Sequence, residues 1–157
     1  MNRFFPILAF TGFTALLPGC SDPPSKPEAL IEHYDESAMN AAIATARSRV
    51  DEFIDVLARG DADTFSVNVP ITDAKGTEHF WLTDVTYADG SFTGLIGNDP
   101  GIVENVEFGQ SRTVAKDAIS DWMFTRGDKI HGGLTIDPLL STYPKEEAEE
   151  LRSQLVR

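Results

Sequence analysis

The sequence predicts an α+β domain in which an N-terminal amphipathic helix packs on a small, curled antiparallel sheet. Two observations carry this prediction: the apolar residues recur with a helical period up to Gly60 and with a period of two after it, and an Asp-Gly turn joins two of the later apolar runs. With 157 residues, of which 41% are apolar and 24% charged, the chain fits one compact domain and not two.

The helix is expected between capping signals at both ends. Asp35, Glu36 and Ser37 supply a cap and first-turn anions, and Arg59 with Gly60 forms a C-terminal stop. Between them, apolar residues recur at three- and four-residue steps on one face: Met39, Ala42, Ile43, Ala46, Val50, Phe53, Ile54 and Leu57. This face is expected to lie in the core and not to form a partner's groove.

About six short strands follow, at 65–72, 79–87, 92–98, 108–114, 121–125 and 130–136. The Asp89-Gly90 turn makes a hairpin of the second and third strands. Pro70 argues that the first strand is an edge strand, because proline cannot donate to a ladder. The regular spacing fits either an open curled sheet or an SH3-like barrel. A weaker, Glu-rich helix is expected at 144–155.

The strand at 79–87 carries apolar residues on both faces. Parity places Trp81 and Val85 on one side and Phe80 and Leu82 on the other. A strand of this kind is expected in the interior of the sheet with both faces covered. Trp81 should therefore be largely buried.

The N-terminus has the features of a lipoprotein signal peptide. Phe4–Leu17 is a mostly apolar run of 14 residues, too short to span a membrane, and Leu17-Pro18-Gly19-Cys20 after it resembles the bacterial lipobox. Plain secretion is the rival, but A-x-A spacing is lacking and Cys20 is the only cysteine. Residues 1–19 are therefore expected to be removed and Cys20 to be acylated, and multiple acyl chains make attachment to a membrane stable.

The mature chain is expected to reside in the bacterial envelope. Ser21 follows Cys20, and by resemblance to Gram-negative lipoproteins a residue other than Asp there implies the outer membrane, facing the periplasm. Residues 20–34 carry the lipidated cysteine and a Pro-rich tether, residues 35–140 form the domain, and residues 141–157 form a helical tail.

The charge of the chain excludes one class of partner. From Cys20 onward there are 12 Lys or Arg against 25 Asp or Glu, a net charge of −13. This charge opposes the electrostatic attraction that nucleic acid offers to basic proteins. We therefore expect no nucleic-acid partner, and a membrane contact through the lipid at Cys20.

Several segments recur in order as in a known family: Met39–Ala42, Thr77–Leu82, Asp84-Val85, Phe92–Gly94, Gly109-Gln110, Ile119–Met123 and Gly132–Ile136. Their pattern resembles the bacterial YegJ-like family, a domain of unknown function (DUF2314). The resemblance covers roughly Asp35 to Ile136. It implies an α+β domain with these boundaries, and it implies no activity.

Seven residues are candidates for a binding or acid/base role: Glu78, His79, Trp81, Asp84, Asp121, Trp122 and His131. Neighbours on a strand point to opposite faces, so Glu78 and His79 cannot ligate one ion together. No metal-binding, nucleophile or phosphate-loop motif is present. We therefore assign no catalytic residue, metal site or cofactor, and the two tryptophans are either core residues or anchors for a partner.

Three functional classes remain. The favoured one is a non-enzymatic periplasmic lipoprotein that binds a protein or another envelope component. An acidic inhibitor or immunity-type protein that caps a basic partner is the second, motivated by the net charge. The third is an enzyme acting on an envelope substrate through Asp, Glu or His groups that the fold brings together.

Overall fold

The computed structural model describes residues 34–156, so the expected signal peptide and Cys20 lie outside the described residues. The helices are α1 Glu36–Ser48, α2 Val50–Arg59, α3 Ile136–Leu139 and α4 Lys145–Gln154, with single 3₁₀ turns at η1 Lys116–Ala118 and η2 Leu140–Thr142. The strands are β1 Thr64–Asp73, β2 Gly76–Ala88, β3 Ser91–Ile96, β4 Ser111–Ala115, β5 Asp121–Arg126, β6 Lys129–Gly132 and β7 Leu155–Val156. In this part of the chain, no helix is long and apolar enough to cross a membrane.

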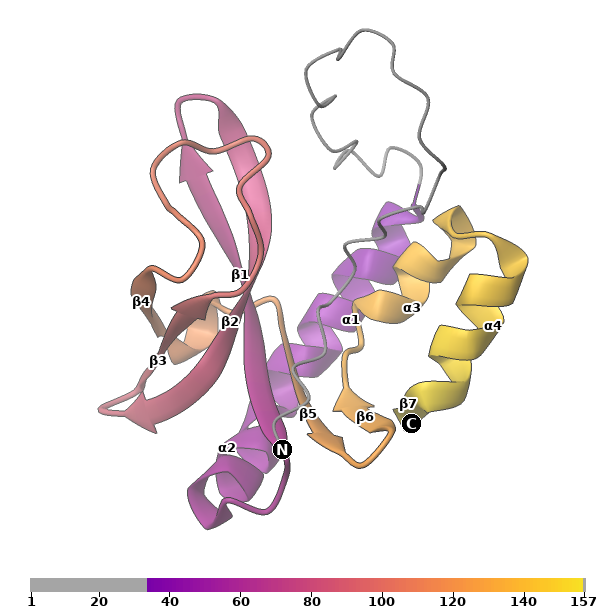
Figure 1. The fold of residues 1–157 in the computed structure, drawn as a ribbon, viewed down its shortest axis with the longest axis horizontal. Helices are drawn as coiled ribbons and strands as arrows, with labels where there is room; N and C mark the ends of the chain where they lie inside the picture. Colours follow the sequence, from indigo (N-terminus) through magenta and orange to yellow (C-terminus); the bar gives the residue numbers. More distant parts are fainter. Residues whose placement is uncertain (1–33, 157) are drawn as a thin grey trace, which may run out of the picture.

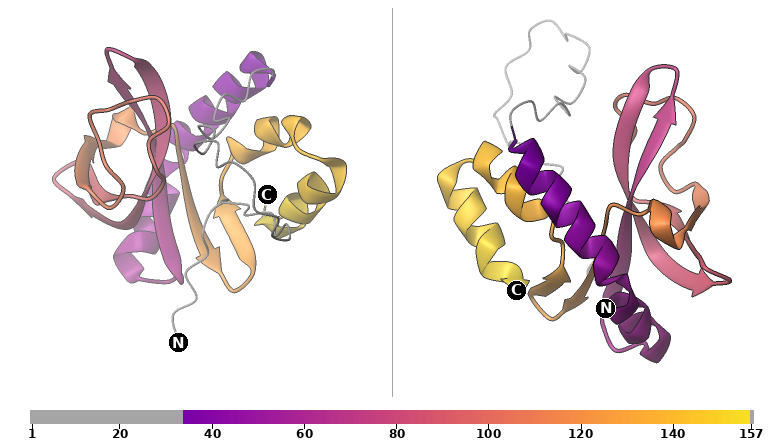
Figure 2. Two further views of the ribbon diagram at one scale, coloured as in Figure 1. Left: turned by 45° about the horizontal axis from the view of Figure 1, so that its top comes forward. Right: turned by 180° about the vertical axis from the view of Figure 1, so that it is seen from behind.

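The strands form one open, curled sheet in the order β4-β3-β2-β1-β5-β6-β7. The neighbours are antiparallel except for β6 and β7, which run parallel. Helices α1 and α2 run along one side of the sheet, whereas α3 and α4 lie beyond its β6–β7 end (Figures 1 and 2). The α+β prediction is confirmed, and of the two predicted architectures the sheet is the open one.

The predicted N-terminal helix has its expected ends but is broken in the middle. Asp35 Oδ1 accepts from the backbone N–H of Ala38 at 3.0 Å, and Gly60 ends α2 with φ +62°. Between them Arg49 leaves the helical conformation, with φ −108° and ψ 8°. At this break the carbonyl of Ala46 accepts a hydrogen bond from the indole Nε1 of Trp122 at 2.8 Å. The same carbonyl accepts from the backbone N–H of Arg49 at 3.2 Å, so it has one donor from the helix end and one from the sheet. The chain forms two helices where the pattern predicted one.

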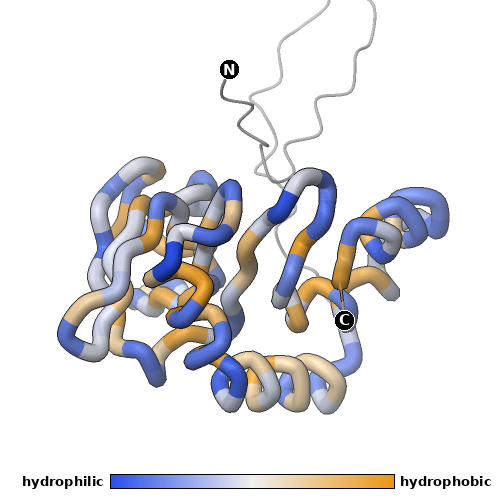
Figure 3. The backbone as a smooth tube through the Cα atoms, turned by 90° about the horizontal axis from the view of Figure 1, so that it is seen from below, coloured by the Kyte–Doolittle hydropathy of each residue, from blue (hydrophilic) through white to orange (hydrophobic). Residues whose placement is uncertain are grey.

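The main core lies between α1, α2 and the sheet. Phe53 of α2 is fully buried and packs on Phe92 and Trp122, with ring centroids 5.8 and 5.6 Å apart. Full burial of one large apolar side chain contributes about 1.5–3 kcal/mol. In Figure 3 hydrophobic and hydrophilic residues alternate along the strands, whereas α4 is largely hydrophilic. The apolar helix face is thus the core face that the sequence predicted.

The prediction that β1 is an edge strand is wrong, because β1 lies between β2 and β5. Pairing with β5, however, reaches only as far as Asn68. The carbonyl of Asn68 accepts a hydrogen bond from the backbone N–H of Ser120. Every second residue of a strand directs its N–H and C=O to the same neighbouring strand, so the even-numbered residues of β1 direct theirs toward β5. Pro70 is also even-numbered, but it lies beyond the last β1 residue that pairs with β5. Its missing N–H therefore costs no ladder bond, and proline is tolerated in an interior strand.

Strand β2 is an interior strand as predicted, but its face assignment changes halfway along. The register with β3 shifts between Thr83 and Thr86, and within this β-bulge Asp84 has φ +51°. One extra residue reverses the parity, so Val85 joins the core face together with Leu82. The bulge also bends the strand and contributes to the curl of the sheet.

Trp81 lies before the bulge, on the face opposite Phe80. Most of its surface is covered, but it is not a core residue, whereas Phe80 is fully buried under the helices. The expectation of a largely buried Trp81 is therefore met only in part, and the helices do not provide its cover. The expectation relied on an unbroken alternation that would have supplied Val85 as an apolar neighbour on the same face.

The strand predicted at 130–136 ends at Gly132. Gly132 and Gly133 both have positive φ, +80° and +62°, and the chain turns into α3. The weak C-terminal helix is present as α4, and the unpredicted β7 returns to pair with β6. A second apolar cluster forms around the buried residues Leu140, Ala148 and Leu155. The segment after residue 140 is therefore packed against the sheet end.

A glycine pair tests the close approach of β6 to Trp122. A Cβ on Gly132 would lie 2.3 Å from the carbonyl oxygen of Trp122, whereas a Cβ on Gly127, also at positive φ, would meet nothing within 4 Å. We expect Gly127→Ala to cost roughly 1–2 kcal/mol for its backbone conformation. Gly132→Ala should cost a further ~1–3 kcal/mol through overpacking. Urea unfolding of both variants measures the difference, and equal losses would contradict the contact.

Candidate functional site

A cleft opens where the α1–α2 joint meets β5 and β6. Its volume is about 260 Å³. Its lining combines apolar walls with a few polar groups: Arg49, Glu52, Val56, Trp122, Phe124, His131, Gly132, Leu134 and Val156. A small apolar cavity with convergent polar groups is the usual form of a ligand site.

Aromatic rings form one wall of the cleft. Trp122 and Phe124 alternate along β5 on the same face, and their rings are nearly parallel with centroids 6.3 Å apart. His131 pairs with Phe124 across the β5–β6 ladder and stacks on it at 4.8 Å. The guanidinium of Arg126 lies 5.1 Å from the Phe124 ring centroid. These contacts fix the wall, since each ring is held by its neighbour.

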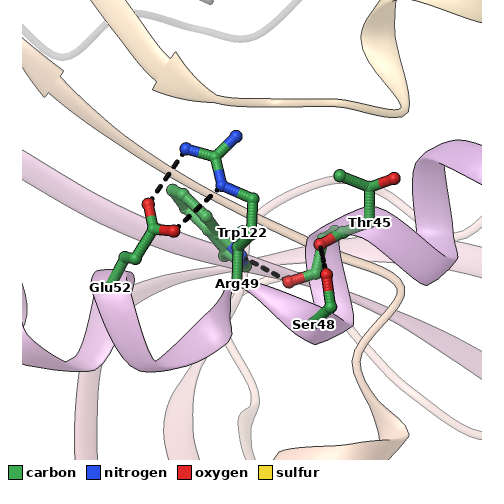
Figure 4. Close-up of polar contacts among 6 residues, drawn as sticks. Thr45, Ser48, Arg49, Glu52 and Trp122 are labelled. Carbon is green, nitrogen blue, oxygen red and sulfur yellow. Dashed lines mark hydrogen bonds and ion pairs between the residues drawn. The ribbon is translucent and has the colours of Figure 1, made fainter.

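The mouth of the cleft carries an ion pair from the helix joint (Figure 4). Arg49 donates from Nε and Nη2 to the two oxygens of Glu52, at 3.1 and 2.9 Å. The hydrogen bonds lower the pKa of Glu52, so both groups are charged at neutral pH. Both side chains are about half exposed, at 46% and 58%. An exposed pair of this kind contributes little stability, so either partner can turn to a ligand at small cost.

The helix break is what brings this pair to the cleft. Ser48 and Thr45 hold the last turn of α1 together, because the Ser48 hydroxyl donates to the Thr45 carbonyl at 2.8 Å. Trp122 then anchors Ala46 beneath it. Figure 4 shows Arg49 and Glu52 rising from the same side of this joint, next to Trp122.

The remaining sequence candidates lie elsewhere. The carboxylate of Glu78 accepts backbone N–H bonds from Gly101, Ile102 and Val103, with its shortest bond 2.9 Å to Ile102. It therefore holds the loop between β3 and β4 in place. Asp84 is exposed in the β2 bulge, where its φ is +51°.

His79 belongs to a polar network on the face of the sheet that carries Trp81. Its Nδ1 lies 3.0 Å from Asn68 Oδ1 and 3.1 Å from Ser120 Oγ, and Ser120 donates to the same Asn68 oxygen at 2.6 Å. Burial lowers the pKa of His79. The ring is thus a neutral link between β2, β1 and the start of β5.

Asp121 is fully buried and fully engaged. Its Oδ2 accepts from the backbone N–H and the hydroxyl of Thr135, at 2.8 and 2.7 Å, and Oδ1 accepts from Trp122 N at 2.8 Å. Burial raises its pKa, and these hydrogen bonds oppose the rise. Asp121 ties the segment after β6 back to β5 and does not line the cleft.

No group of three or more His, Cys, Asp or Glu side chains in residues 34–156 is arranged to hold a metal ion. Asp61 and Asp63, which follow α2, bind the β5–β6 turn. Asp61 pairs with Arg126 at 2.7 Å, and Asp63 accepts from Gly127 N at 2.7 Å. The polar side-chain groups at the cleft are one guanidinium, one carboxylate and one imidazole.

Of the seven sequence candidates, the structure brings Trp122 and His131 together in the cleft. Arg49 and Glu52 were missed, because a charged pair three residues apart on a helix has the pattern of a solvent-facing ion pair. The sequence pointed to them only through their position: both lie within two residues of the core residue Val50, next to the helix break that contacts Trp122.

A family model described as "Uncharacterized protein conserved in bacteria (DUF2314)" matches residues 36–155. The chain belongs to this family. The match confirms the resemblance expected from the sequence and extends it through α4. The family description assigns no activity, so functional inference depends on the site itself.

Two curated proteins are similar in sequence to the chain. The chain is 65% identical to the uncharacterized protein YegJ of Escherichia coli over 124 residues, which are 79% of this chain and 81% of that protein. It is 40% identical over 79 residues to a putative ankyrin repeat protein of Neisseria meningitidis serogroup B, covering 50% of this chain and 31% of that protein. No solved structure matches the chain.

The His79 network predicts a pH dependence of stability. Because burial lowers the pKa of His79 in the fold, the unfolded chain takes up a proton first as the pH falls. The stabilising contribution is present above the ordinary histidine pKa of about 6.5 and is lost as the pH falls through it. We expect the free energy of unfolding to decrease less between pH 7.5 and 5.5 in His79→Gln than in the wild type, as measured by urea unfolding. An identical decrease would contradict this role.

Proposed function

We propose that this DUF2314 protein is a lipid-anchored, non-enzymatic binding module of the bacterial envelope, and that the cleft at the helix joint is its binding site. The observation that carries the binding role is the contrast between the cleft and the other polar groups. In the cleft, an adaptable ion pair borders an apolar cavity of about 260 Å³.

The existing hydrogen bonds of the two acid/base candidates Glu78 and Asp121 favour a binding function over a catalytic one. Glu78 is held by three backbone N–H groups, and Asp121 by two N–H groups and a hydroxyl. A carboxylate with such partners positions the backbone and has little capacity left for proton transfer to a substrate. The cleft, in contrast, offers shape and charge for recognition.

The envelope location is supported by the sequence before the domain. The family match begins at residue 36, after the apolar run, the Leu17–Cys20 motif and the Pro-rich tether. Acyl chains on Cys20 would hold the domain at a membrane surface, with the tether as a spacer.

An acidic inhibitor of a basic partner is the second candidate, and the charge of α4 favours it. The helix exposes Glu146, Glu149 and Glu150 on its surface. A cationic partner could be attracted to this surface through complementary charge. In this alternative the contact surface would be α4 and not the cleft.

Labelling with palmitate tests the anchor. We expect labelled palmitate to enter the wild-type protein in bacteria and not Cys20→Ser, because the thiol is the acceptor. Recovery of the label with the membrane fraction measures the result. Equal labelling of both proteins, or a mature N-terminus at another residue, would overturn the anchor.

Photo-crosslinking in intact cells tests the binding site. Val156 and Phe108 are both exposed apolar residues, but only Val156 borders the cleft. A photoreactive amino acid placed at Val156 should give an adduct with an envelope component, whereas the same group at Phe108 should not. A third position at Glu150 reports on the acidic surface. Adducts from Glu150 alone favour the inhibitor, and equal or no adducts from Val156 and Phe108 contradict the cleft.

A further inference from the structure

The size of the cleft restricts its ligand to something small. Its volume of about 260 Å³ lies below the ~300–1,000 Å³ of sites for drug-sized molecules. Its walls are largely hydrocarbon and aromatic, from Val56, Trp122, Phe124 and Leu134. The ligand should therefore present an apolar body about the size of one large side chain.

The mouth of the cleft provides a site for one anionic group. Arg49 uses Nε and Nη2 for Glu52, and its Nη1 has no partner among residues 34–156. A guanidinium has five N–H donors in a plane and can hold two carboxylates along different edges. A ligand carboxylate can therefore bind Arg49 beside Glu52, or take the place of Glu52.

The charges around the mouth favour a monoanion over the other charge types. Glu52 would repel a phosphate dianion more strongly than a monoanion. An anion can bind the free Nη1 edge of Arg49 without breaking the ion pair, whereas both oxygens of Glu52 already accept hydrogen bonds from Arg49. Burial and the charge of Arg126 lower the pKa of His131, so this ring is a neutral hydrogen-bonding group at pH 7.

From this geometry we propose that the cleft binds an apolar monocarboxylate, with its carboxylate on Arg49 and its hydrocarbon body against Leu134, His131 and Val156, the lining residues whose side chains are not fully buried. Two sources offer this chemistry: a free small carboxylic acid and the C-terminal residue of a peptide with a large apolar side chain. The inference rests on the proposed binding function and specifies its ligand class.

Calorimetric titration of the full chain in detergent micelles tests the proposal. The probes are 3-phenylpropionate, phenethylamine, and a tripeptide ending in phenylalanine with either a free or an amidated C-terminus. We expect 3-phenylpropionate to bind at least tenfold more tightly than phenethylamine, because only the acid can use Arg49. Tighter binding of the free tripeptide than of its amide and of 3-phenylpropionate identifies a peptide end as the source. Binding of 3-phenylpropionate alone identifies a free acid.

Variants of two arginines separate recognition from stability. Arg49→Gln should weaken 3-phenylpropionate binding at least tenfold, and Arg49→Lys should weaken it less, because the charge remains but the planar fork is lost. Arg59→Gln is the matched control, since Arg59 is an exposed arginine in the last turn of α2 and does not line the cleft. Thermal unfolding checks that the three variants fold alike.

Two results would overturn the proposal: the amine binding as tightly as the acid, or Arg49→Gln binding 3-phenylpropionate as the wild type does. The crosslinking at Val156 separates this failure from that of the proposed function. If Val156 gives an envelope adduct while no carboxylate probe binds, the cleft is a binding site for another chemistry. If both experiments fail, the binding function and the ligand class fail together.

Discussion

The hydrogen bond from the Trp122 indole to the Ala46 carbonyl is the interaction on which the rest of the structure depends. The same carbonyl also accepts from the backbone N–H of Arg49 at 3.2 Å, so Trp122 adds a second donor from the sheet at the point where the helix breaks. The Trp122 ring packs at the same time against Phe53. One side chain thus joins the end of α1 to the sheet and contributes to the lining of the cleft.

The charged and polar side chains divide into two kinds by what they contact. Glu78 and Asp121 accept hydrogen bonds from backbone groups and fix the segments after β3 and β6. These bonds satisfy the backbone N–H groups of irregular segments, which would otherwise need solvent or another partner. Within residues 34–156, the side chains of Arg49 and Glu52 form hydrogen bonds only with each other, and both remain about half exposed. This difference separates the proposed recognition site from the structural polar groups, although all four residues are charged residues in the sequence.

The sequence predictions were accurate where the signal was local. The Asp89-Gly90 hairpin has both residues at positive φ, at +50° and +76°, as the turn chemistry requires. The helix caps and the starts of the strands were also close to their predicted positions. The errors at Pro70, Val85 and the helix break share one cause. Pro70 depends on where β5 ends, Val85 on a bulge in β2, and the helix break lies where a side chain of β5 binds α1. The hydrophobic period of a single segment cannot predict features that depend on a neighbouring element.

By itself the sequence determined the α+β class, the family and the apolar helix face, because capping, turn preference and hydrophobic period act over a few neighbouring residues. Of the cleft it indicated Trp122 and His131, but as isolated residues among seven candidates. Only the tertiary structure decided that Arg49 and Glu52 join them, since these pairs lie at least 70 positions apart in the chain. The physical reason is that the cleft is made by packing: the chain breaks at Arg49 where the Trp122 indole binds Ala46, and this joint places a guanidinium beside the aromatic residues of β5.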